Sequence, residues 1–153
     1  MVIQMIRIIY IATLVFLSTS CTSANDGTEP TLYPLNIEKI ENIKTTSNGI
    51  KALADSNSKI HCKNFILSKK EVEKYFELAK KVQKSDYRHM LDWSPCFVTG
   101  EITLQNGITG KWSIHQYKAG TINFEDRDTI YTYCPNCKAK MFDKPEYITK
   151  PKN

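Results

Sequence analysis

Residues 97–134 read FVTGEITLQNGITGKWSIHQYKAGTINFEDRDTIYTYC. Apolar and polar residues alternate along much of this stretch, which is the pattern of strands that bury one face. Groups of turn residues divide it at Asn106-Gly107, Lys118-Ala119-Gly120 and Glu125-Asp126-Arg127-Asp128. The pattern therefore predicts a four-stranded antiparallel meander with strands at Phe97–Gln105, Thr109–Tyr117, Thr121–Phe124 and Thr129–Cys134.

The Asn106-Gly107 turn decides how the first two of these strands pair, because Asn-Gly between apolar runs is a strong hairpin signal. A plain two-residue turn would pair Ile102 with Lys111 and place Ile102 on the face opposite Trp112. One extra residue near Gly110 would bring Ile102 opposite Trp112, and glycine is the residue that a bulge tolerates best. We therefore predict a β-bulge at Gly110.

A helix is expected from Lys69 to about Lys84. Ser68 and Glu71 have the spacing of a capping box, and Leu67 and Val72 that of a hydrophobic staple. Apolar residues then recur at helical spacing and form one stripe that we expect to face the core: Val72, Tyr75, Phe76, Ala79 and Val82.

The two segments before this helix are less regular. Lys59–Leu67 is expected to be a strand, because Ile60, Cys62 and Ile66 share one parity. Leu35–Asp55 is expected to hold irregular structure or one short element. The predicted fold class is α+β, with one long amphipathic helix packed on an antiparallel four- to five-stranded meander.

The N-terminus has the composition of an export signal. Arg7 is followed by ten mostly apolar residues, Ile8–Leu17. A helix of this length rises about 15 Å, roughly half the hydrocarbon thickness of a bilayer. That is too short to span a membrane and suits the apolar core of a signal peptide, which we expect over residues 1–20.

Ser18-Thr19-Ser20 precede Cys21, and this stretch resembles the lipobox of bacterial lipoproteins. The resemblance implies that Cys21 is acylated and becomes the mature N-terminus, anchored in a membrane of the cell envelope. In the family a leucine stands three residues before the cysteine, whereas here that residue is Ser18 and Leu17 lies one position further back. Ordinary signal cleavage, before Cys21 or after Ala24, is the alternative, and it would release the protein to the periplasm.

Composition divides the rest of the chain. Residues 21–34 are polar and contain Gly27, Pro30 and Pro34, so a flexible tether is expected there. Residues 35–153 have the length of a single domain. The net charge of the whole chain is +5, and no run of basic residues interleaved with aromatics is present, which argues against a nucleic-acid partner. Thr22 after Cys21 favours the outer membrane, facing the periplasm, in a Gram-negative cell.

The chain has five cysteines, and four remain if Cys21 is acylated. An even number outside the cytosol favours disulfides, for which the candidates are Cys62, Cys96, Cys134 and Cys137. Sequence leaves three connectivities open, and we expect a bridge from Cys96 to Cys134 or Cys137. Two alternatives remain, a thiol–disulfide oxidoreductase that uses Cys134-Pro135-Asn136-Cys137, and a structural zinc site that uses all four cysteines.

The loop between the helix and the meander is a candidate interaction loop, with His89, Asp92 and Trp93 as its residues. His89 and Asp92 would suit a base and its orienting group, but no nucleophile motif accompanies them. In the alternative interpretation, Trp93 and Pro95 close one end of the core. No catalytic residue and no cofactor are assigned.

We expect a non-enzymatic binding module of the cell envelope, held at a membrane by the lipid anchor, with a protein partner of unknown identity. One form of it is an inhibitor or immunity protein that blocks a toxic enzyme. The alternative is a periplasmic thiol–disulfide oxidoreductase or a structural zinc-binding domain built on Cys134 and Cys137.

Overall fold

The computed structural model describes residues 27–53 and 60–142. The expected signal peptide, Cys21 and the first part of the expected tether lie outside the described residues. In the described ranges no helix is long and apolar enough to cross a membrane.

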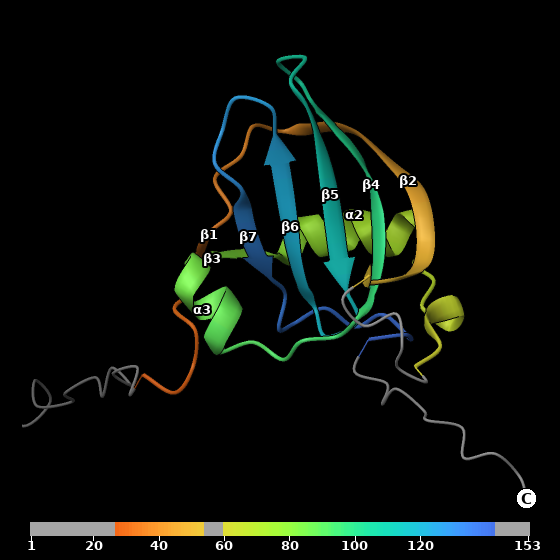
Figure 1. The fold of residues 1–153 in the computed structure, drawn as a ribbon. Coiled ribbons are helices and arrows are strands. Elements are labelled where there is room, and N and C mark those ends of the chain that lie inside the picture. Colours follow the sequence, from red (N-terminus) through yellow and green to blue (C-terminus); the bar gives the residue numbers. More distant parts are fainter. Residues whose placement is uncertain (1–26, 54–59, 143–153) are drawn as a thin grey trace, which may run out of the picture.

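The described chain forms a seven-stranded antiparallel sheet in the order β1-β3-β7-β6-β5-β4-β2 (Figure 1). Three short helical segments accompany it: η2 (Cys62–Asn64), α2 (Lys69–Leu78) and α3 (Lys84–His89). The strands are β1 (Tyr33–Pro34), β2 (Ile40–Lys51), β3 (Lys80–Val82), β4 (Cys96–Leu104), β5 (Thr109–His115), β6 (Ala119–Phe124) and β7 (Ile130–Tyr133).

The predicted fold class is wrong, because residues 27–53 and 60–142 form mostly sheet and contain no long amphipathic helix. The capping box is present, since Glu71 N–H donates to Ser68 Oγ and Ser68 N–H donates to Glu71 Oε2. However, α2 ends at Leu78, because Ala79 takes an extended ψ of 146°. The chain then forms β3, which pairs with β7, so Val82 is buried in a strand.

The expectation of irregular structure for Leu35–Asp55 is also wrong, because β2 is a strand of 12 residues that pairs with β4. The three-residue spacing of Ile40 and Ile43, which resembles a helix, comes from a register shift between Ile40 and Asn42. The shift lets both isoleucines face the core, opposite Leu104 and Ile102. Directly before this segment, β1 lies inside the expected tether and pairs with β3.

The strand expected at Lys59–Leu67 is absent from its described part, residues 60–67. This part contains η2 instead, and it buries Cys62, Phe65 and Leu67 while Ile66 is exposed. The shared parity of Ile60, Cys62 and Ile66 therefore does not mark one buried face.

The hairpin of β4 and β5 has its extra residue in the turn. Thr103 pairs with Thr109 and Ile102 with Gly110, without a shift along the two strands. Within the turn, Gly107 N–H donates a hydrogen bond to Leu104 O, and Gly107 has a positive φ of 84°. The prediction of a bulge at Gly110 is therefore wrong in position, although the extra residue does place Ile102 and Trp112 on one face, where both are buried.

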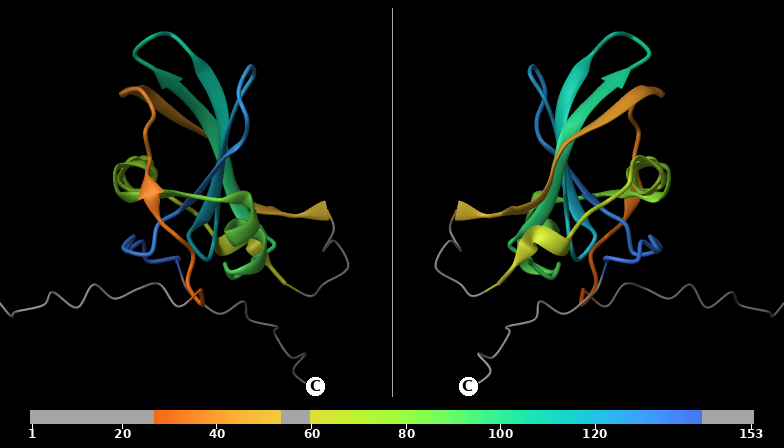
Figure 2. Two further views of the ribbon diagram at one scale, coloured as in Figure 1. Left: turned by 90° about the vertical axis from the view of Figure 1, so that its left-hand side faces the viewer. Right: turned by 90° about the vertical axis from the view of Figure 1, so that its right-hand side faces the viewer.

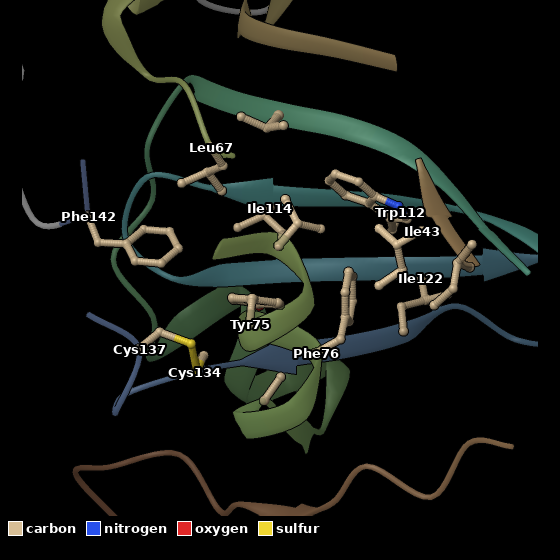
Figure 3. Close-up of a cluster of buried hydrophobic side chains, with 14 of the residues drawn as sticks. Ile43, Leu67, Tyr75, Phe76, Trp112, Ile114, Ile122, Cys134, Cys137 and Phe142 are labelled. Atoms are coloured by element: carbon tan, nitrogen blue, oxygen red, sulfur yellow. A yellow bond between two sulfur atoms is a disulfide. The ribbon is translucent and has the colours of Figure 1, made fainter. Parts of the chain in front are cut away.

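One face of the sheet is covered and holds the core. Figure 2 shows α2 and the segment 134–142 on one side of the sheet, and α3 packs on the other side, where Tyr87 lies 4.8 Å from Tyr131. Figure 3 shows how Tyr75 and Phe76 of α2 point toward side chains of the sheet. Phe76 meets Trp112 edge-on at 5.8 Å. We call this the closed face; its buried strand side chains are Ile43, Cys96, Val98, Ile102, Leu104, Trp112, Ile114, Ile122, Phe124 and Thr132.

Candidate functional site

The four candidate cysteines form two disulfides, Cys62–Cys96 and Cys134–Cys137. The prediction of disulfides is confirmed, but the expected bridge from Cys96 to Cys134 or Cys137 is wrong. Cys96 pairs with Lys51 at the end of β2. The segment η2, which contains Cys62, also contacts β2, and this brings Cys62 close to Cys96. Cys134 and Cys137 close a turn directly after β7, where Cys137 N–H donates to Cys134 O at 3.1 Å.

The burial of these bridges bears on the two alternative chemistries. Cys134 is fully buried and Cys137 is 4% exposed, whereas thiol exchange requires a thiolate to reach the sulfur. The residues that follow, 138–142, form no helix whose N-terminus could lower a thiol pKa. A zinc site would need the same four sulfurs as thiolates, and the disulfides consume them. The described ranges contain no cluster of three or more His, Cys, Asp and Glu residues arranged to hold a metal.

The expected interaction loop runs from the end of α3 to β4 along the lower end of the sheet in Figure 1. Its second half is rigid and buried: Ser94 and Pro95 are inaccessible, and Ser94 Oγ accepts a hydrogen bond from Cys96 N–H. His115 Nδ1 lies 3.1 Å from Ser94 O, so this nitrogen carries the hydrogen. Pro95 therefore closes this end of the core.

Trp93 does not close the core, because 61% of its surface is exposed. His89 and Asp92 are exposed as well, and in the described part of the chain no hydrogen bond or ion pair joins them. The geometry therefore gives no support for a base and its orienting group. It does place a large aromatic side chain in solvent directly beside a disulfide-fixed strand.

Two further apolar side chains lie beside this loop. Leu32 and Met90 are each 41% exposed and line one hollow of about 360 Å³, to which Asp92 also contributes. Residues 28–30 line the same hollow, so the described chain begins at this end of the molecule. We call Leu32, Met90 and Trp93 the apolar end. Trp93 was expected from the sequence as part of an interaction loop, whereas the apolar surface at Leu32 and Met90 was not, because the path of residues 28–32 brings these two side chains together.

The face of the sheet opposite the closed face is polar, and we call it the open face. Hydroxyl side chains form a row across its strands, because Thr99 pairs with Ser113, Ser113 with Thr121, and Thr121 with Tyr131. The Ser113 and Thr121 hydroxyls are 2.8 Å apart. Tyr87 of α3 covers the Tyr131 end of the row, and burial raises the pKa of Tyr87 to about 12.

A second row on the open face carries charges. Lys44 pairs with Glu101, Glu101 with Lys111, and Lys111 with Asn123, and all four are exposed. The last three line a shallow depression of about 530 Å³. Neither row was expected from the sequence, although alternate positions of the predicted strands carry them. Whether these side chains line up across the sheet depends on the register of the strands, and the bulge predicted at Gly110 implies a different register from the observed one.

No protein-family model, no curated protein and no solved structure matches this chain.

Proposed function

We propose that the protein is an exported lipoprotein, held at a membrane of the cell envelope by acyl groups on Cys21, and that it acts there as a non-enzymatic binding module. The observation that carries the proposal is the pair of buried disulfides in a domain with a polar sheet face that α3 covers only at its β7 end. Structural disulfides persist in oxidising compartments outside the cytosol. This agrees with the short apolar segment and the lipobox-like residues before Cys21.

The open face is the surface that we assign to a protein partner. It is built on strands rather than on loops, so its side chains are held in fixed register. The row Lys44–Glu101–Lys111 alternates in sign, and alternating charges select a partner with complementary charges more than they add affinity. A protein inhibitor or immunity protein is the form of partner-binding that suits a small, rigid module of this kind.

Two experiments test the two halves of the proposal. Mass spectrometry of the mature N-terminus should find Cys21 acylated, and Cys21→Ser should move the protein from the membrane fraction to the soluble one. An unmodified N-terminus at another residue would overturn the anchor.

For the binding face, the full-length protein is captured from envelope extracts as wild type and as the double variant Glu101→Lys, Lys111→Glu. Exchanging the two charges preserves net charge but destroys the alternation of sign along the row Lys44–Glu101–Lys111. The matched control is Lys74→Glu, Glu77→Lys, which exchanges an exposed ion pair of 2.8 Å on α2. We expect one stoichiometric partner that the open-face variant loses and the control keeps. Equal recovery by both variants, or no partner with wild type, would overturn the assignment.

A further inference from the structure

The apolar end and the start of the described chain lie together. Leu32 and Met90 line the same hollow as residues 28–30, and Trp93 follows Asp92, which lines it too. Thr31 N–H donates to Asp86 Oδ2 at 3.1 Å, and Tyr33 pairs with Lys81. These contacts hold residues 31–33 against α3 and β3, so the chain leaves the body at this end.

The short connection to Cys21 limits where this end can go. Thr28 lies seven positions after Cys21, and a fully extended chain over seven positions spans at most about 25 Å. With the acyl chains of Cys21 in a bilayer, the end of the body nearest to the lipid is therefore the one that carries Trp93. A side chain restricted to this distance meets the surface at a high effective concentration.

The chemistry of the exposed side chains suits the boundary between lipid headgroups and acyl chains. Tryptophan is enriched there because its ring is amphipathic, and Leu32 and Met90 add apolar surface in the hollow lined by Asp92, the residue before Trp93. The neighbouring residues of α3 include Arg88, which is exposed and suits lipid phosphates. Glu29 and Asp92 are exposed nearby and oppose deep insertion, so the contact is confined to the interface.

We propose that the apolar end docks on the bilayer surface, with Trp93 as its main anchor. This inference rests on the membrane anchor of the proposed function. Docking would stand the long strands away from the membrane, with the Asn106-Gly107 hairpin farthest from it, as the opposite ends of the sheet in Figure 1 indicate. The open face would then be turned sideways and left free for a protein partner.

The two tryptophans of the chain allow a direct test. Trp112 is 2% exposed in the core, whereas Trp93 is 61% exposed. The full protein, as cells process it, is reconstituted into vesicles whose phospholipids carry bromine near the headgroup. We expect wild-type emission to lose the Trp93 component, and the Trp93→Phe variant, which emits from Trp112 alone, to show no quenching. A second variant, Met90→Ser, keeps both tryptophans and should show weaker quenching of Trp93 emission.

The controls separate docking from anchoring. Mass spectrometry of the same sample reports whether Cys21 is acylated. If Cys21 is not acylated, the proposed lipid anchor is wrong. Docking is then measured on the same chain with a hexahistidine in place of Cys21, bound to vesicles that contain a nickel-chelating lipid. Quenching of Trp93 in either tethered form supports docking. Absence of quenching in a tethered protein that keeps the near-ultraviolet dichroism of Trp112 overturns it.

Discussion

The two faces of the sheet are built from the same strands but by different chemistry. On the closed face, large apolar side chains pack against α2, and the Trp112 indole lies over Gly100 so closely that any side chain there would overlap it. On the open face, neighbouring strands present hydroxyls and alternating charges that contact one another or solvent. Burial of apolar surface is the main source of stability. Substitutions on the closed face should therefore change folding, and most substitutions on the open face only recognition.

The largest effect should follow removal of the Cys62–Cys96 bridge, whose sulfurs lie in the core behind the closed face. The bridge joins residues 34 positions apart, and the loss of that constraint on the unfolded chain is worth about 4 kcal/mol. The matched variant removes Cys134–Cys137, which spans 3 positions, and should cost about 2 kcal/mol. Urea unfolding of the two double Cys→Ala variants measures both. Equal losses would contradict this ranking of the bridges.

Gly100→Ala should give the next largest effect. The new Cβ would overlap Lys44 O on the neighbouring strand and the Trp112 ring at once. Neither backbone nor a buried indole can move freely, so we expect a loss of about 3 kcal/mol, toward the upper end for overpacked cores. The control is Thr99→Ala, one residue earlier on the open face, with a loss of about 0.5 kcal/mol or less. Unfolding curves and the fluorescence of Trp112 report both, and equal stability of the two variants would remove the distinction between the faces.

Part of this architecture could be predicted from sequence. The strands β4, β5, β6 and β7 fall close to the predicted ranges, because local alternation and turn residues determine where such strands begin and end. The start of α2 follows from Ser68 and Glu71 for the same reason, since a capping box is a local interaction. The even set of cysteines indicated disulfides, again without tertiary information.

The remaining errors concern interactions between residues far apart in sequence. Ala79 and Val82 fit a helical stripe, but the chain gains more by pairing β3 with the edge of β7. The strand β2 has only three apolar side chains, Ile40, Ile43 and Ile50, and a register shift separates the first two, so it has no local strand signal. The disulfide partner of Cys96 depends on where β2 ends. The formation of the apolar end depends on the path of residues 28–32. None of these is encoded in a short window of sequence.

A third test compares the same substitution on the two faces. On the closed face, the Tyr75 hydroxyl lies 3.0 Å from Lys118 O and 3.0 Å from Thr132 Oγ1, fully buried. In Tyr75→Phe the Thr132 hydroxyl loses this partner in an apolar environment, which should cost about 1.5 kcal/mol. Tyr87→Phe removes a partly exposed hydroxyl on the open face and should cost about 0.5 kcal/mol or less. Thermal unfolding of both variants decides, and a larger loss for Tyr87→Phe would contradict the comparison.

The smallest expected effect concerns His115, a residue of the open face that contributes to folding. His115 belongs to that face, yet it is largely covered, with Nδ1–H donating to Ser94 O and its ring 5.5 Å from Phe97. Burial lowers the pKa of His115 below the ordinary value of 6.5, and the bond to Ser94 offsets this only in part. Below pH 6.5 the unfolded chain therefore binds a proton that the folded chain resists, so stability falls as pH decreases.

His115→Gln should flatten this fall, because glutamine carries no titrating proton and its amide can still donate to Ser94 O. The measurement is the free energy of unfolding in urea between pH 7.5 and 5.5, above the range where Glu38 and Glu71, whose pKa values lie below 4.5, take up protons. His89→Gln is the matched control, since His89 is exposed at the end of α3. If wild type and His115→Gln lose stability in parallel over this range, His115 is not the group responsible.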